Sequence, residues 1–158
     1  MKKYASYIIN DFKVKIGYEE EAITELKVSS MFGNDESGER SEVTDAAVAQ
    51  LKEYFEGTRK VFEIDINPEG TVFQKQVWDA LLKIPYGETR SYAQIAEAVG
   101  NKNACRAVGM ANNKNPIAII IPCHRVIGSD GSLTGYAGGL EVKRKLLEIE
   151  NVKNSLEK

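Results

Sequence analysis

Residues 71–100, TVFQKQVWDALLKIPYGETRSYAQIAEAVG, contain two start signals for helices. Thr71 and Ser91 are each followed three positions later by a glutamine, which is the pattern of the capping box. In that motif the hydroxyl accepts a hydrogen bond from the third helical residue, whose side chain reaches back to the cap. Apolar residues then recur at helical spacing. The pattern predicts one helix over 72–84 and a second over 92–99.

A third helical segment, ACRAVGMANN, follows over residues 104–113 after a short turn that contains Gly100. Two short helices joined in this way form the outline of a helix-turn-helix, a motif whose second helix enters a groove of DNA. The second helix here is rich in alanine and glycine, which permit close approach to a partner backbone. The same small residues would equally permit tight packing within the protein, so both interpretations stay open.

The amino-terminal side of this helical region has a different periodicity. Residues 4–11 and 13–30 alternate between apolar and polar side chains, which indicates antiparallel strands. Residues 44–60 have apolar side chains at helical spacing, and residues 62–66, FEIDI, alternate again like a short strand. Nothing in this half resembles a catalytic site, and we interpret its carboxylates as a solvated surface.

The turn sequence NPEG, residues 67–70, separates the strands from the helices. It combines turn-forming residues with a change in composition, so we place a domain boundary there. The predicted fold class is α/β in the mixed, α+β sense. A small amino-terminal domain with antiparallel strands occupies residues 1–69, and a mainly helical domain that contains the helix-turn-helix occupies residues 70–158.

Charge is distributed unevenly between the two predicted domains. Residues 1–69 contain 9 Lys/Arg and 15 Asp/Glu, whereas residues 70–158 contain 12 and 8. A cationic face gains affinity for nucleic acid by releasing counterions, so the second domain is the one suited to a polyanion. The excess of positive charge is also compatible with a mildly basic domain that has no such partner.

The composition argues against membrane and metalloprotein classes. No apolar run approaches the roughly 18 residues of a membrane span, and the amino terminus lacks the apolar region of a signal peptide. We therefore expect a cytoplasmic protein with no membrane partner, in which Cys105 and Cys123 are reduced thiols. One histidine and two cysteines without ligand spacing do not suit a closed zinc site, so no metal is predicted.

The sequence IAIIIPCHRVIG, residues 117–128, contains the only histidine of the chain. Residues 117–121 are apolar and mostly β-branched, which predicts a buried extended strand. Proline cannot continue the ladder, so the chain must leave the strand at Pro122. Cys123 would then lie on a turn at the mouth of the core, where a thiol is a candidate nucleophile. A small apolar residue that ends a core strand is the simpler alternative.

A nucleophilic thiol needs a base, because at a pKa of about 8.5 only a few per cent is ionised at neutral pH. His124 is the one imidazole in the chain. Adjacent side chains of a strand point in opposite directions, so contact between Cys123 and His124 requires a turn or a bridging water. Glu148 and Glu150 near the carboxyl terminus are both candidates for orienting the imidazole, and spacing alone does not choose between them.

These residues resemble a known family. IPCHRVIG, with RAVGMANNKNP before it and GYAGGLEVKRKLLEIE after it, is similar to the O6-alkylguanine-DNA alkyltransferases, also called methylated-DNA–protein-cysteine methyltransferases. The resemblance runs from Val72 to Glu150. It implies direct repair of double-stranded DNA that contains O6-alkylguanine and leaves O4-alkylthymine open as a second substrate. The damaged base is flipped out, and its alkyl group passes irreversibly to a cysteine, without a cofactor and once per molecule.

The resemblance also implies roles for individual residues. Cys123 corresponds to the alkyl acceptor, His124 to its base acting through a water, and Glu150 to the carboxylate that orients the histidine. Asn115 joins the recognition helix to the active-site turn, and Tyr92 meets the flipped base with its hydroxyl. The other substrate-binding residues are Arg106, which fills the vacated place in the base stack, and Val126, Tyr136 and Ala137.

Two other functions compete with this one. A lesion-binding alkyltransferase-like protein would recognise the base without repairing it, but such proteins carry tryptophan where this chain has Cys123. A cysteine hydrolase built on Cys123 and His124 would need an ester or amide substrate and repeated turnover, and local cysteine signatures do not transfer between families. We therefore expect a monomeric DNA repair methyltransferase. Cys105, beside Arg106, is interpreted as a small residue in a tight helix contact with DNA.

Overall fold

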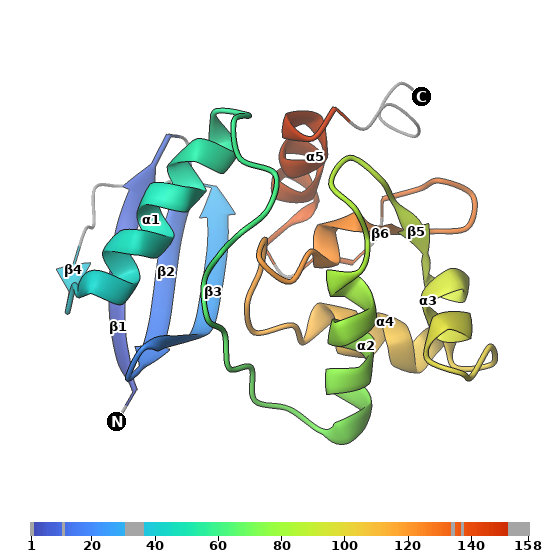
Figure 1. The fold of residues 1–158 in the computed structure, drawn as a ribbon. Coiled ribbons are helices and arrows are strands. Elements are labelled where there is room, and N and C mark those ends of the chain that lie inside the picture. The colour runs from blue at the N-terminus through green and yellow to red at the C-terminus, as the bar shows by residue number, and fades with distance from the viewer. Residues whose placement is uncertain (1, 11, 31–36, 134, 137, 152–158) are drawn as a thin grey trace.

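The computed structural model describes residues 2–10, 12–30, 37–133, 135–136 and 138–151. The amino-terminal half is a sheet with one helix across its face, and the carboxyl-terminal half is a group of helices beside it (Figure 1). The predicted mixed α/β class, with antiparallel strands first and helices second, is confirmed. None of the helices in this part of the chain combines the length and the apolar character that a bilayer span requires.

Four strands form an antiparallel sheet. They are β1 (Lys3–Ile9), β2 (Phe12–Glu19), β3 (Ala22–Ser30) and β4 (Ser37–Gly38), in the spatial order β3-β2-β1-β4. Along β1, the side chains of Ala5, Tyr7 and Ile9 are buried and those between them are less so. This is the period of two that the alternating sequence predicts.

Helix α1 (Glu42–Phe55) covers the apolar face of this sheet (Figure 1). It starts earlier than predicted because Ser41 is its cap, and the side chain of Thr44 returns a hydrogen bond to the backbone of Ser41. The Tyr7 hydroxyl of β1 donates to Thr44 at 2.7 Å. A buried hydrogen bond therefore ties the start of the helix to the sheet.

The carboxyl-terminal half confirms both capping boxes. Thr71 caps one helix and Ser91 another, each with its glutamine partner. The helices are α2 (Val72–Leu82), α3 (Tyr92–Ala98), α4 (Cys105–Asn113) and α5 (Leu140–Ile149). α3 and α4 pack against each other, and the binding of this pair in a DNA groove stays a prediction. A short parallel pairing of β5 (Arg90–Ser91) with β6 (Val126–Ile127) was indicated by no pattern.

Two of the predicted strands are wrong. Residues 62–66 and 117–121 each form only a single bridge, through Ile66 and Ile117, to the outer edge of β3. Around the first bridge the hydrogen bonds run between Ile23 and the residues flanking Ile66, and no ladder continues from them. Both segments lie along an edge strand that would otherwise expose unpaired backbone groups. They cover this edge without extending the sheet.

Residues 117–121 form a buried turn. The backbone N–H of Ile121 donates to the carbonyl of Ile117 at 3.1 Å, and Ile119 has a φ of 72°. Prolines at both ends remove backbone donors and limit the extended run. The apolar composition predicted the burial correctly and the conformation incorrectly, because a buried turn needs apolar side chains as much as a strand does.

One apolar core runs through both halves and includes Leu26, Leu51, Trp78 and Ile117. The Trp78 indole N–H donates to the carbonyl of Ala111 at 2.9 Å, which joins α2 to α4. α5 lies at the junction, where it contacts β3, α1 and the turn that follows Pro122 (Figure 1). That residues 1–69 and 70–158 are separate domains stays a prediction. Because the two halves share one core, each half stabilises the other.

Candidate active site around Cys123

Cys123 begins one turn of 3₁₀ helix, Cys123–Arg125, directly after Pro122. The backbone N–H of Arg125 donates to the carbonyl of Pro122 at 3.0 Å and closes this turn. Because the chain turns here, Cys123 and His124 are not held on opposite faces as they would be in a strand. Cys123 is 5% exposed and His124 is 0% exposed, so both functional groups lie inside the protein.

Asn115 shapes the approach to this turn. Its Nδ2 donates to the carbonyl of Ile121 at 2.8 Å, and its Oδ1 accepts from the backbone N–H of Ile117 at 3.0 Å. One side chain thus clamps both ends of the buried segment 117–121. Asn112 on α4 adds a hydrogen bond to the carbonyl of Cys123 at 3.4 Å. The amides therefore link the end of α4 to the backbone that carries the thiol.

Glu150, at the end of α5, is the centre of a buried hydrogen-bond network. Its Oε2 lies 2.6 Å from Nε2 of His124, and Arg125 binds both carboxylate oxygens, at 2.8 Å through Nε and at 3.1 Å through Nη2. The backbone N–H of Gly87 donates to Oε1 at 3.1 Å. Glu148 is exposed, and within the described ranges its ion pair is with Arg144, at 4.0 Å. Of the two carboxylates that the spacing left open, Glu150 is the one in contact with the imidazole.

The hydrogen bonds assign the proton on His124. Burial raises the pKa of the Glu150 carboxyl, but the hydrogen bonds and charges of His124 and Arg125 outweigh burial and hold that pKa well below its usual range. Glu150 is therefore an anion that only accepts hydrogen bonds, so Nε2 is the ring nitrogen that carries hydrogen. Nδ1 is buried and has no hydrogen-bond partner among the described residues. It is the nitrogen able to take up a proton.

The thiol of Cys123 is held in its neutral form. Burial raises its pKa, against the opposing effects of a hydrogen bond with Asn115 and the charge of Lys143. Lys143 is itself buried, and its Nζ donates to the carbonyl of Val126 at 2.6 Å. Burial lowers the pKa of Lys143 to about 8, although the charge of Cys123 acts in the opposite direction. A thiol kept neutral in this way needs a base before it can act as a nucleophile.

A cavity of about 870 Å³ opens onto Cys123. Asn115, Tyr136 and Gly138 line it from the carboxyl-terminal half, and β2 and β3 line it from the amino-terminal half. The Tyr136 hydroxyl is buried and has no hydrogen-bond partner in the part of the chain that the structure describes. The volume lies in the range of sites that bind small organic molecules.

The structure gathers some of the predicted site residues and leaves others apart. Tyr92 is half-buried at the start of α3, and Arg106 is exposed on α4. Val126 is buried in β6 and does not line the cavity, and Ala137 lies outside the described residues. The residues that meet at the cavity or at the carboxylate are Cys123, His124, Glu150, Asn115 and Tyr136.

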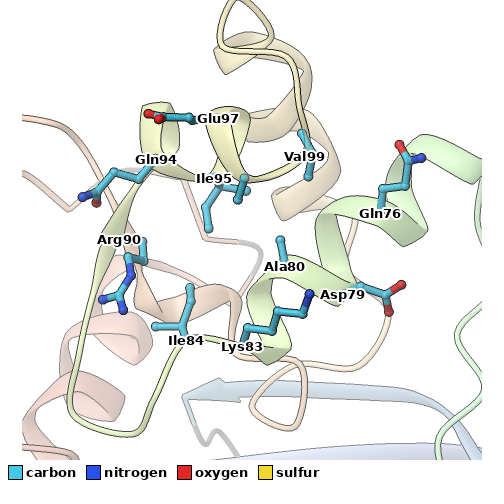
Figure 2. Close-up of a pocket in the computed structure, with 11 residues that line it drawn as sticks. Gln76, Asp79, Ala80, Lys83, Ile84, Arg90, Gln94, Ile95, Glu97 and Val99 are labelled. Atoms are coloured by element: carbon cyan, nitrogen blue, oxygen red, sulfur yellow. The ribbon is translucent and has the colours of Figure 1, made fainter.

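A second cavity, of about 770 Å³, lies between α2 and α3 and contains none of the predicted site residues. Figure 2 shows that both acidic and basic side chains, among them Asp79, Lys83, Arg90 and Glu97, line it. No three His, Cys, Asp or Glu side chains are grouped to hold a metal ion anywhere in the described ranges.

Three residues of the site were not found from the sequence. They are Arg125, Tyr54 and Lys143, and no motif in the sequence singles them out. Tyr54 lies on the apolar face of the helix predicted over residues 44–60. A tyrosine on such a face usually has a buried hydrogen-bond partner for its hydroxyl, but the sequence does not identify that partner. The partner is Glu150, 96 positions further along the chain.

Stability should fall between pH 7 and pH 5 because of His124. Burial lowers the pKa of His124 below its ordinary value of 6.5, despite the opposite effect of Glu150. The unfolded chain then takes up a proton before the folded one does, so the contribution is complete above about pH 6.5 and is lost below it. We expect a loss of about 1–2 kcal/mol in urea unfolding between these two pH values. His124→Asn should remove this dependence, and an unchanged slope in that variant would contradict the assignment.

Comparison with known proteins supports the resemblance. Residues 72–152 match the model of the family described as 6-O-methylguanine DNA methyltransferase, DNA binding domain. A methylated-DNA–protein-cysteine methyltransferase of Methanosarcina acetivorans is 59% identical over 112 residues, which cover 71% of this chain and 72% of that protein. The protein of the same name from Mycobacterium tuberculosis is 60% identical over 104 residues, covering 66% and 63%.

Solved structures extend the likeness to the amino-terminal half. The O6-methylguanine methyltransferase of Mycobacterium tuberculosis has a TM-score of 0.83 at 42% identity and covers 95% of this chain and 93% of its own. The structure of OGT in complex with DNA, from the same organism, has a TM-score of 0.81 at 44% identity and covers 93% of this chain and 91% of its own. The resemblance seen in IPCHRVIG and its flanks is thus confirmed, and the chain belongs to the 6-O-methylguanine DNA methyltransferase family.

Proposed function

We propose that this protein repairs alkylated DNA by transferring the alkyl group from O6 of guanine to the sulfur of Cys123, once per molecule. The observation that carries the proposal is the neutral, buried thiol at a cavity large enough to admit a nucleobase, next to a histidine whose Nδ1 has no partner in the described part of the chain. Family membership supports the same reaction, because the curated relatives are named for it.

The proposed chemistry balances without a cofactor. A water between the two side chains passes the thiol proton of Cys123 to Nδ1 of His124, and the Glu150 anion stabilises the imidazolium. The sulfur then attacks the alkyl carbon, so a C–S bond forms while the C–O6 bond breaks and its electron pair stays on guanine. A proton donated by the Tyr92 hydroxyl, and replaced from solvent, neutralises the purine. The thioether is stable, so the reaction stops after one event.

Repair of duplex DNA requires the alkylated guanine to flip out of the base stack into the cavity. Extrusion costs a few kcal/mol of stacking, which an inserted side chain offsets. Arg106 is suited to insertion because it is exposed on α4. Tyr136, whose hydroxyl has no hydrogen-bond partner among the described residues, would line the base pocket. The family resemblance adds Val126 and Ala137 as substrate-binding residues.

Arg106→Ala should slow repair of duplex DNA about tenfold or more, because the flipped state loses the side chain that replaces the base. Reaction with free O6-benzylguanine, which needs no flipping, should keep its rate. Single-turnover rates with both substrates make the comparison. Arg144→Ala, an exposed arginine on α5, is the matched control and should alter neither rate. An equal loss with both substrates in Arg106→Ala would contradict the role in flipping.

The function is tested by mass spectrometry of the protein after mixing with duplex DNA that contains O6-methylguanine. We expect the mass of one methyl group on the peptide that carries Cys123, saturating at one per molecule. Tight binding of the lesion without an adduct would identify a lesion-binding protein instead. If the protein neither binds the lesion nor forms an adduct, the hydrolase becomes the favoured alternative.

We also infer that the protein acts as a cytoplasmic monomer and that residues 70–158 form the DNA-binding part. Two features support the first inference: Cys105 and Cys123 are unpaired thiols, and the reaction needs only one copy of the site. Sedimentation of the protein alone and with a short duplex measures its oligomeric state.

A further inference from the structure

The amino-terminal half contributes one side chain to the network around Glu150. Tyr54, one residue before the end of α1, donates its hydroxyl hydrogen to Oε2 of Glu150 at 2.5 Å. The same oxygen of Tyr54 lies 3.3 Å from Nε2 of His124. Tyr54 is 0% exposed, and it lies outside residues 72–152, which match the family model. A residue of the first half therefore touches two groups of the candidate active site.

The position of this hydroxyl is set by packing. The Tyr54 ring meets the rings of Phe55, Phe62 and Tyr86, with centroids 5.7, 5.6 and 6.2 Å away. α1 also contacts α5, and the carboxyl-terminal end of α1 lies on the side of the sheet that faces α5 (Figure 1). Side chains fixed in this way hold a hydrogen bond at low entropic cost, so the contact with Glu150 belongs to the folded core.

The hydrogen bond from Tyr54 changes what Glu150 can do. Oε2 accepts from Tyr54, His124 and Arg125 together, at 2.5, 2.6 and 3.1 Å. Each donor stabilises the carboxylate and makes it a weaker base. When His124 takes up a second proton at Nδ1, the Glu150 carboxylate is too weak a base to remove the hydrogen from Nε2. Burial and the charge of Glu150 raise the pKa of Tyr54 well above its ordinary value, so its hydroxyl remains a donor.

We propose that Tyr54 is a positioning residue that acts through Glu150: its hydrogen bond keeps the carboxylate a weak acceptor for Nε2–H of His124 while the alkyl group moves to Cys123. The inference rests on the proposed function, in which His124 takes the thiol proton. The amino-terminal half then does more than stabilise the fold, because it completes the hydrogen-bond set of the carboxylate. The ionisable groups that face His124 or its carboxylate are Glu150 and Lys143 of the α5 segment, Cys123 and Arg125 of its own turn, Tyr54 of α1, and Tyr86 after α2.

Removal of the hydroxyl has a defined consequence. In Tyr54→Phe the carboxylate loses one donor and becomes a stronger acceptor for Nε2–H of His124, which favours the imidazolium. The pKa of His124 should rise by about half a unit to one unit. Because only neutral His124 accepts the thiol proton, the acid limb of the transfer rate should move to higher pH by the same amount. At a pH on that limb the variant should react about 3-fold to 10-fold more slowly.

The experiment is an NMR titration of the imidazole in the full chain, combined with single-turnover rates on duplex O6-methylguanine across pH. His124 is the only histidine, so its ring signals need no assignment. Tyr7→Phe is the matched control, because it removes a buried tyrosine hydroxyl that bonds to the same helix without touching Glu150. We expect a raised His124 pKa and a shifted acid limb in Tyr54→Phe, with both unchanged in Tyr7→Phe. A titration in Tyr54→Phe that matches the control, or that moves downward, would overturn the proposal.

If Tyr54→Phe does not fold, the NMR spectrum of the wild-type protein tests the proposal instead. The Tyr54 hydroxyl hydrogen should give a slowly exchanging downfield signal with a cross-peak to Nε2–H of His124, and its absence while Nε2–H is visible would overturn the proposal. The titration requires no alkyl transfer. If the wild-type protein forms no adduct, the proposed function is wrong. If it forms the adduct but the pKa of His124 is unchanged in Tyr54→Phe, only the role of Tyr54 is wrong.

Discussion

Cys123→Ser should abolish alkyl transfer, with a single-turnover rate at least about 1,000-fold below that of the wild type. Serine is close in size, but its hydroxyl ionises far less readily than a thiol and is a weak nucleophile without stronger activation. The site around Cys123 already keeps a thiol neutral through burial, and a hydroxyl would be harder still to ionise. Mass spectrometry after incubation with O6-methylguanine duplex measures the adduct directly.

Lesion binding should survive this change, because Arg106 and the other exposed residues of α4, which we propose to meet the DNA, are untouched. Gel-shift affinity for the damaged duplex is the check that Cys123→Ser is folded. Cys105→Ser is the matched control, since Cys105 is the other thiol and lies exposed on α4. It should react at the wild-type rate. An adduct on any residue of Cys123→Ser at a comparable rate would disprove the acceptor.

Glu150→Gln should lower both stability and reaction rate strongly. Arg125 and His124 lose the anion that they share, and the guanidinium of Arg125, which is 7% exposed, is left without its partner. Breaking a buried ion pair from one side costs about 3–5 kcal/mol. An amide also presents an N–H that competes for the contact with Nε2. The rate of transfer should therefore fall about 100-fold to 10,000-fold, as expected for the loss of general-base catalysis.

Glu148→Gln is the control for this prediction, because Glu148 is two positions away and forms an exposed ion pair with Arg144 instead of a contact with His124. It should change stability by no more than about 1 kcal/mol and leave the rate unchanged. Urea unfolding and single-turnover kinetics measure the two quantities in each variant. Equal effects of the two substitutions, or a stable and active Glu150→Gln, would show that the carboxylate does not serve His124.

Local signals were sufficient for much of the fold. The capping boxes at Thr71 and Ser91 lie within four residues of chain, so nearby atoms alone determine where α2 and α3 begin. The alternation of apolar and polar side chains along β1, β2 and β3 likewise depends only on neighbouring residues. The stretch around Cys123 indicated the family, because its residue types and their order are local as well.

The sequence by itself thus determined the element types over most of the chain, the burial of residues 117–121 and the identity of the candidate nucleophile and its base. Tertiary structure alone decided that residues 117–121 turn and that Tyr54 joins the site, and it brought Glu150 into the contact with His124 that the spacing left open and the family resemblance implied. The physical reason is distance along the chain. A helix cap or strand alternation depends on residues a few positions apart, whereas Tyr54 meets a partner 96 positions away, and only the packing of α1 against α5 brings the two together.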